Sequence, residues 1–305
     1  MKYLRFLFFG FFCNFLIAED YCNVVSTPEG VSKITISHQN LEREYRVYVP
    51  KSYTGNRSLP VVLNFHGTGS SADKQAEYSG MDELSEELDF IHINPQGKNL
   101  NGRPVFNAGL TMNSPTNKRD FSLEPRDDVS FAKAIIKDVS SKICVDRNRI
   151  YATGMSNGGR MSYRLGCEAA DVFAAIAPVA GVLSLEPKDC NPSRSIPTLS
   201  FHGTSDFVSK YDRPGGFSTM SAPDMLKLWA KKNQCSSNSE ITFKKKDISC
   251  ESYKSCGNEK GEVTLCTVIN GGHCWPGKPC WSGASYTINA SKKIIDFFYR
   301  FSLND

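Results

Sequence analysis

The chain has 305 residues, of which 40% are hydrophobic and 22% are charged, so it can bury a substantial core. This composition excludes a disordered tail and a coiled coil. The formal net charge is only +4, which excludes the strongly basic surface of a nucleic-acid-binding protein. No Gly/Ser-rich or Pro-rich linker divides the sequence, so we predict one folded domain over residues 19–305.

The first 18 residues have the features of a secretory signal peptide. Two basic residues precede an apolar run from Phe6 to Ile17, and Ala18 stands before two acidic residues. A run of about 12 residues is short for a bilayer, which needs roughly 20. We therefore predict a signal peptide over residues 1–18 and a secreted mature chain without a membrane segment. The alternative is an N-terminal transmembrane anchor.

The elements that follow predict an α/β fold. Residues 33–37 and 43–49 alternate apolar and polar side chains and predict a strand pair. Short apolar runs that end in Gly-containing turns then alternate with segments of helix length, which is typical of a mostly parallel, doubly wound sheet with helices on both faces. The predicted strands are 60–65, 90–94, 149–153, 173–180, 197–202 and 262–269. The predicted helices are 77–88, 128–144, 220–232 and 291–301.

One long segment has no clear period. Residues 98–125 are rich in Asn, Pro and Gly and exceed the length of an ordinary connection. Long loops are either functional or irregular, so this segment is a candidate wall of a substrate site.

A candidate nucleophile follows the predicted strand 149–153. Ser156 lies in Gly154-Met-Ser-Asn-Gly158, and a helical stretch begins at Arg160. A G-x-S-x-G turn between a strand and a helix needs small residues, because the turn is strained and the strand and helix approach closely. This context predicts that the Ser156 hydroxyl attacks a substrate. The alternative is a surface serine in a Gly-rich turn.

Activation of a serine needs a histidine base that a carboxylate orients. In doubly wound hydrolases the acid and then the base follow the serine, each after a strand. Of the five histidines, only His273 follows the last predicted strand. Asp206 lies four residues beyond the strand that ends at His202, so we predict it as the acid. The alternatives are a satisfied polar histidine and an aspartate in an ordinary turn.

The reaction also needs donors for an oxyanion. These are normally the backbone N–H after the nucleophile and one from the loop after an early strand. We predict the backbone amides of Asn157 and Thr68 for this role. Thr68 stands in His66-Gly-Thr-Gly69, where a glycine on each side lets its amide face the site.

Several ordered motifs together resemble one secreted esterase family. The chain is similar to polyhydroxybutyrate depolymerases and feruloyl esterases from about Ser37 to its end. The resemblance implies an α/β-hydrolase fold, serine esterase activity, and Ser156, Asp206 and His273 as the triad. Phe106 to Gly109 stand where the family usually has a Trp, and Cys274 stands where Thr is common. The motifs are His66-Gly-Thr68, Asn94-Pro-Gln-Gly97, Arg126-Asp-Asp-Val129, Arg149-Ile-Tyr-Ala-Thr-Gly-Met-Ser-Asn-Gly-Gly159, His202-Gly-Thr-Ser-Asp206 and Gly271-Gly-His-Cys-Trp-Pro-Gly277.

The cysteines agree with export. The chain has eleven, and removal of Cys13 with the signal leaves ten, an even number that indicates several disulfides. No C-x2-C pair is present, so we predict no metal site. Cys274 adjoins the predicted base, and we hypothesise a local disulfide to Cys280. Pairing with a distant cysteine is the alternative.

The predicted substrate-binding residue is Trp275, which with Trp281 offers a flat apolar face. The alternative is that both tryptophans serve only to pack the loop.

These observations predict a secreted serine carboxylic-ester hydrolase that works through an acyl-enzyme without a cofactor. Its expected partner is an ester: a feruloyl or acetyl ester of plant polysaccharide, or a polyhydroxybutyrate-type polyester. No nucleic acid or membrane partner is expected, and the sequence makes no prediction of oligomeric state. The alternatives are a non-catalytic extracellular binding protein on a hydrolase fold and a serine peptidase of the same fold.

Overall fold

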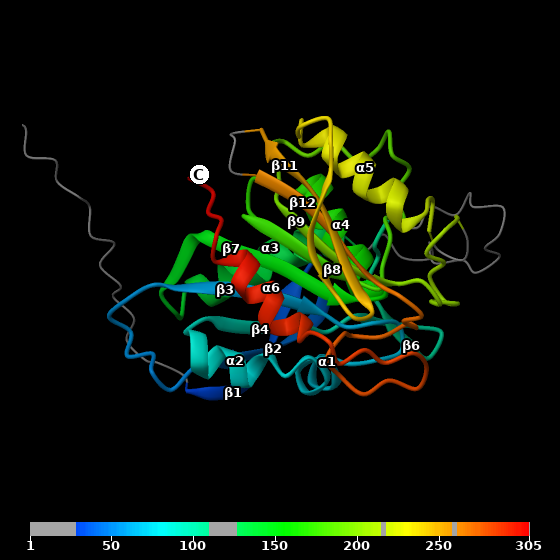
Figure 1. Cartoon of the computed structure of the whole chain (residues 1–305). Coiled ribbons are helices and arrows are strands. Elements are labelled where there is room, and N and C mark those ends of the chain that lie inside the picture. The colour runs from blue at the N-terminus through cyan, green and yellow to red at the C-terminus, as the bar shows by residue number, and fades with distance from the viewer. Residues whose placement is uncertain (1–28, 110–126, 215–217, 258–260, 305) are drawn as a thin grey trace, which may run out of the picture.

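Among the described residues, ten strands form one large sheet and two more form a separate hairpin. The computed structural model describes residues 29–109, 127–214, 218–257 and 261–304. The large sheet has the order β1-β2-β4-β3-β7-β8-β9-β12-β11-β10, and β5 pairs with β6 (Figure 1). The strands are β1 (Gly30–His38), β2 (Leu41–Val49), β3 (Leu59–Phe65), β4 (Ile91–Pro95), β5 (Lys98–Leu100), β6 (Arg103–Val105), β7 (Val145–Met155), β8 (Ala175–Val179), β9 (Thr198–Gly203), β10 (Glu240–Lys245), β11 (Ile248–Cys256) and β12 (Gly261–Val268).

The centre of the sheet is parallel and its two margins are antiparallel. Parallel pairing runs from β4 through β3, β7, β8 and β9 to β12. The pairs β1–β2, β2–β4, β11–β12 and β10–β11 are antiparallel. The strands β3, β4, β8 and β9 are buried along their whole length, which explains their continuous apolar runs. Because parallel strands end at the same edge, the loops after β3, β7, β9 and β12 converge there.

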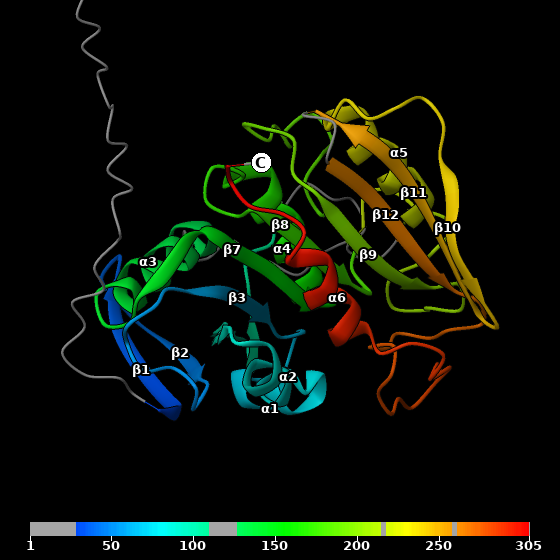
Figure 2. The ribbon, with the colours of Figure 1, turned by 60° about the vertical axis from the view of Figure 1, so that its left-hand side comes forward.

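Helices cover both faces of the sheet. One apolar cluster joins the sheet to α3, α4 and α5, and a second joins it to α2 and α6. Figure 1 shows α6 in front of the sheet and α4 behind it, and Figure 2 shows the twist from β1 at one margin to β10 at the other. This arrangement confirms the predicted architecture. The helices are α1 (Ala72–Ser79), α2 (Met81–Leu88), α3 (Asp128–Ser140), α4 (Asn157–Glu168), α5 (Ala222–Lys232) and α6 (Ala290–Phe298).

The predicted helix over residues 77–88 is wrong in its extent. The segment forms two helices, α1 and α2, which meet at Gly80. Gly80 has φ +64°, a left-handed conformation that ends α1 and begins α2. Ser71 starts α1 earlier than predicted, because its side chain accepts a hydrogen bond from the amide of Lys74.

Three other segments differ from the prediction. The helix predicted over 128–144 ends at Ser140, and β10 and β11 lie in a stretch for which no strands were predicted. β10 is exposed along nearly its whole length, so its sequence carries no buried face. Residues 98–105 form the β5–β6 hairpin, whereas residues 110–125 of the predicted long loop lie outside the described residues.

Disulfides join several of the cysteines that follow residue 18, as the sequence indicates. The bonds among described residues are Cys167–Cys190, Cys235–Cys256, Cys250–Cys266 and Cys274–Cys280. Cys144 is disulfide-bonded as well.

The predicted signal peptide lies outside the described residues. Within the described part of the chain, none of the helices combines the length and apolar character of a transmembrane span.

Candidate active site

Ser156 lies at a sharp turn between β7 and α4. Its φ is +57° and its ψ −113°, which is a strained conformation for a residue with a side chain. The Ser156 amide donates to the carbonyl of Val179 on β8 at 2.9 Å, and its own carbonyl accepts the first helical hydrogen bond from Arg160 at 3.0 Å. These bonds hold the turn at the carboxyl edge of the sheet, with Ser156 half-buried.

The small residues around Ser156 are required by close backbone contacts. A Cβ on Gly158 would lie 2.0 Å from the carbonyl oxygen of Phe65, and one on Gly154 would lie 2.5 Å from the same atom. A Cβ on Gly159 would lie 2.7 Å from the carbonyl oxygen of Val179. The turn therefore has the geometry that the G-x-S-x-G pattern predicts.

The structure brings the predicted acid and base into contact. His273 Nδ1 lies 2.7 Å from Asp206 Oδ2, and the Asp206 side chain is fully buried. Asp206 Oδ1 accepts hydrogen bonds from the amides of Val208 and Ser209 at 2.9 and 2.8 Å. Because the carboxylate accepts from Nδ1–H, a neutral His273 has its lone pair on Nε2, where a proton can be received.

The surroundings of Asp206 favour its charged form. Burial acts to raise the pKa of Asp206, but the hydrogen bond and charge of His273, the Ser209 amide and the nearby His202 together lower it below its ordinary value. His202 donates from Nε2 to the carbonyl of Ser209 at 2.7 Å, and burial lowers the pKa of His202. Asp206 is thus a carboxylate suited to orient and stabilise an imidazolium.

Backbone contacts hold two loops together. They are the loop after β9 that carries Asp206, here the acid loop, and the loop after β12 that carries His273, here the base loop. The amide of Thr204 donates to Val268 at 2.9 Å, and that of Ser205 donates to Gly271 at 2.8 Å. A Cβ on Gly203 would lie 2.2 Å from the Gly271 carbonyl oxygen, so only glycine allows this approach. The base loop is closed by the disulfide Cys274–Cys280, which confirms the hypothesis of a local bond.

The two predicted oxyanion donors flank the nucleophile. Asn157 is the first residue of α4, where an amide has no partner within the helix. A Cβ on Gly67 would lie 3.4 Å from Ser156 Cβ, and the following residue, Thr68, lines the same cleft as Ser156. The Asn157 side chain accepts from the Phe106 amide at 2.8 Å and donates to the Phe106 carbonyl at 3.1 Å, which fixes the chain behind the site.

His66 supports the Thr68 loop, a role that the sequence interpretation missed. Its Nδ1 donates to the Gly67 carbonyl at 2.7 Å, and its Nε2 accepts from the Gly97 amide at 2.9 Å. Burial lowers the pKa of His66 to about 4, so the ring is neutral at pH 7. The sequence feature that could have indicated this role is the position of His66 at the end of a buried strand, directly before Gly67.

A cleft of about 470 Å³ opens over these residues. Ser156 and His273 both line it, together with Gly67, Thr68 and, at its rim, Trp281. The prediction that Trp275 contacts substrate is wrong. Trp275 is fully buried and its indole N–H donates to Ser291 Oγ at 2.9 Å, so its faces are covered by the core beneath α6.

Known proteins resemble this chain in sequence and in fold. The chain is 35% identical over 254 residues to "Feruloyl esterase B" of Piromyces equi, an alignment that covers 78% of this chain and 44% of that protein. The chain is thus similar in sequence to feruloyl esterases and has the fold of the α/β-hydrolases. It is also 28% identical over 199 residues to "Feruloyl esterase D" of Neurospora crassa, covering 61% of each chain. The chain thus spans less than two thirds of either relative.

Two further comparisons concern the fold. The sequence profile of the prolyl oligopeptidase family matches residues 124–230, which contain Ser156 and Asp206. The solved structure of "Acetyl xylan esterase from Aspergillus awamori" superposes with a TM-score of 0.65 at 14% identity, over 88% of this chain and 99% of that one. Neither relative named above is a polyhydroxybutyrate depolymerase, so that part of the resemblance stays a prediction.

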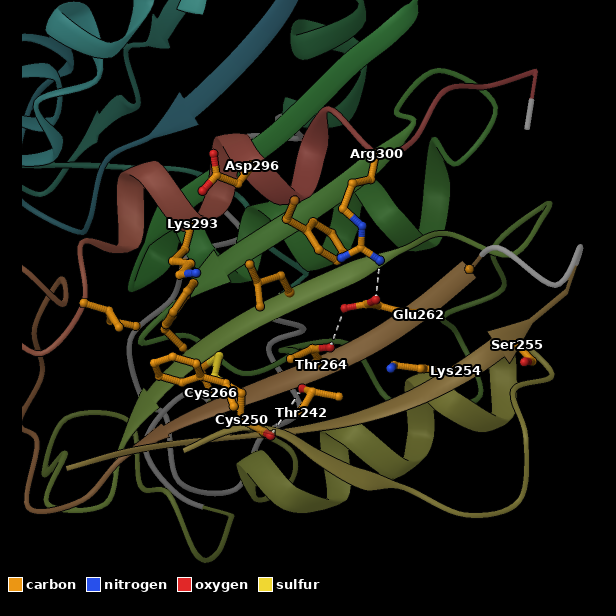
Figure 3. A pocket seen from close by; sticks show the side chains of 16 residues that line it. Thr242, Cys250, Lys254, Ser255, Glu262, Thr264, Cys266, Lys293, Asp296 and Arg300 are labelled. Atoms are coloured by element: carbon orange, nitrogen blue, oxygen red, sulfur yellow. Dashed lines mark hydrogen bonds and ion pairs between the residues drawn. A yellow bond between two sulfur atoms is a disulfide. The ribbon is translucent and has the colours of Figure 1, made fainter. Parts of the chain in front are cut away.

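A second cavity of this esterase-like chain lies away from the candidate catalytic residues. It has a volume of about 570 Å³ and lies between α6 and the face of β9, β12 and β11 (Figure 3). Of its charged groups, Glu262 pairs with Arg300, whereas Lys254 pairs with Glu240 and Asp296 with Lys292. The Cys250–Cys266 disulfide forms part of its wall. Among the described residues, no group of His, Cys, Asp and Glu is arranged to hold a metal ion.

Proposed function

We propose that the protein hydrolyses carboxylic esters through an acyl-enzyme on Ser156. His273 is the proposed base and Asp206 the residue that orients it. The observation that carries this proposal is the 2.7 Å contact between His273 Nδ1 and the buried Asp206 carboxylate, next to a cleft that both His273 and the strained Ser156 line.

In the proposed first step, Ser156 Oγ attacks the ester carbonyl carbon while its proton passes to His273 Nε2. The negative charge that develops on the carbonyl oxygen is stabilised by the amides of Thr68 and Asn157. The C–O bond to the alcohol then breaks, and His273 returns its proton to the leaving oxygen. Water repeats the sequence on the acyl-enzyme, which releases the acid and the free Ser156. No step calls for a cofactor.

We propose a feruloyl or acetyl ester of plant polysaccharide as the substrate, with a polyhydroxybutyrate-type polyester as the alternative. The first choice is supported by the names of the feruloyl esterase relatives and by the likeness in fold to an acetyl xylan esterase. The disulfides fit an oxidising compartment, which supports secretion after removal of residues 1–18.

Turnover of methyl ferulate, acetylated xylan and a polyhydroxybutyrate suspension, each by the parent protein and by Ser156→Ala, tests this proposal. We expect the substitution to lower kcat about 10⁴-fold or more on the preferred ester. Equal turnover by both proteins contradicts the assigned nucleophile, and absence of turnover by the folded parent favours a non-catalytic binding protein.

A p-nitroanilide amide in the same assay separates ester from peptide hydrolysis. This arm is needed because the prolyl oligopeptidase profile matches the segment around Ser156. Preferential cleavage of the amide over the esters contradicts the esterase assignment.

A further inference from the structure

Two exposed aromatic side chains form a surface beside the cleft. Phe207 is 49% exposed and Trp281 is 72% exposed. Their rings are in edge-to-face contact, with centroids 4.8 Å apart. Large apolar side chains that stay this exposed are informative when they adjoin one another at a site. Trp281 also lines the cleft that contains Ser156 and His273.

Both rings are carried by the loops of the candidate acid and base. Phe207 directly follows Asp206, and the two residues after Phe207 are bonded through their amides to the Asp206 carboxylate. Trp281 directly follows Cys280, whose disulfide to Cys274 closes the base loop. The aromatic pair is therefore held at a fixed position relative to His273, which lowers the entropy cost of binding a ligand there.

The chemistry of the proposed reaction assigns a side of the cleft to each half of the ester. His273 must protonate the leaving alcohol oxygen, so the alcohol departs on the side of the imidazole. The base loop supplies Pro279, Cys280 and Trp281 to the cleft wall. A group attached to the leaving oxygen thus extends along this loop toward Trp281 and Phe207.

We propose that the Phe207–Trp281 pair is a platform for a neutral sugar ring of the leaving alcohol, an assignment that rests on the proposed esterase function. A sugar presents C–H groups on its ring face, and a flat indole covers such a face without displacing the hydroxyls from water. Among the described residues that line the cleft there is no carboxylate, and Lys74 is the one lysine or arginine. The chemistry at the rim therefore fits an uncharged glycosyl group.

The test compares two esters that share the acyl group and differ in the alcohol: methyl ferulate and a feruloylated xylo-oligosaccharide. In Trp281→Ala we expect the ratio of kcat/KM for the oligosaccharide ester to that for methyl ferulate to fall about tenfold, chiefly through KM. Trp281→Phe retains a ring and recovers part of the ratio. Ile241→Ala removes another exposed apolar side chain, 57% exposed on β10, and leaves the ratio unchanged.

If the ratio of the two kcat/KM values does not change in Trp281→Ala, because both values either stay the same or fall by the same factor, the proposal is overturned. A binding measurement separates this failure from failure of the esterase assignment. Ser156→Ala is titrated with the unesterified xylo-oligosaccharide by calorimetry, alone and combined with Trp281→Ala. Binding that weakens about tenfold with the second substitution supports the platform even if the parent shows no turnover, whereas equal binding by both proteins refutes it.

Discussion

The buried ring of His66 makes a sharp prediction about acid stability. In the folded chain its Nε2 accepts a hydrogen bond from the Gly97 amide and its Nδ1 donates to the Gly67 carbonyl. A proton on Nε2 removes that acceptor and leaves a buried cation beside an N–H donor. The substitution His66→Gln keeps an acceptor near the Nε2 position and cannot titrate.

The size of the effect follows from proton linkage. The pKa of His66 is lowered by burial from 6.5 to about 4, so the folded chain binds this proton less readily than the unfolded chain does. The resulting stability is fully present above pH 6.5 and is lost as the pH falls toward 4. Between pH 8 and pH 4.5 the loss from this one group is about 2.5 kcal/mol.

Urea unfolding of the two proteins at pH 8 and pH 4.5 measures this quantity, with the disulfides intact. His66→Gln lowers the free energy of unfolding at pH 8, because the glutamine packs less well against Phe106, whose ring centroid is 4.7 Å from that of His66. The decrease between the two pH values, however, should be about 2.5 kcal/mol smaller in the variant than in the parent. An equal decrease in both proteins would refute the inference that His66 is buried in its neutral form.

Two further predictions concern the acid and the base loop. Asp206→Asn should lower kcat about 10⁴-fold, because an amide neither fixes the required tautomer nor stabilises the imidazolium. Since its surroundings lower the pKa of Asp206, the acid limb of the parent's pH–rate profile should not reflect this carboxyl; a limb that disappears in the variant alone contradicts this. Replacement of Cys274 and Cys280 by Ser should lower the free energy of unfolding by about 2 kcal/mol in urea titrations and should lower kcat/KM on methyl ferulate. The matched change at Cys235 and Cys256 should lower stability without that loss of activity.

Much of the sheet could be predicted because burial on both faces leaves a strong signal. The strands β3 and β9 are continuous apolar runs and are buried throughout. The edge strand β10 (Glu240–Lys245) is exposed along nearly its whole length and has a strand neighbour on one side only, β11. Whether residues 240–245 form a strand depends on their pairing with β11, which the sequence of these residues alone does not predict. Gly80 was visible in the sequence, but the helical period across it concealed a break that its backbone conformation imposes.

In the candidate site, too, some features could be predicted from the sequence and others could not. Strand order and Gly-containing turns predicted that the loops of Asp206 and His273 would meet, and the two side chains are in contact. The orientation of a tryptophan within the base loop follows from contacts with a distant element. Trp275 points inward, where it packs in the core and its indole N–H donates to Ser291 at the start of α6, whereas Trp281, after Cys280, is exposed beside the cleft. Ser291 also donates to the carbonyl of Ser79 at the end of α1. These contacts of Trp275 are with elements distant in the sequence, so neither the spacing nor the residue types of the base loop distinguish the buried indole from the exposed one.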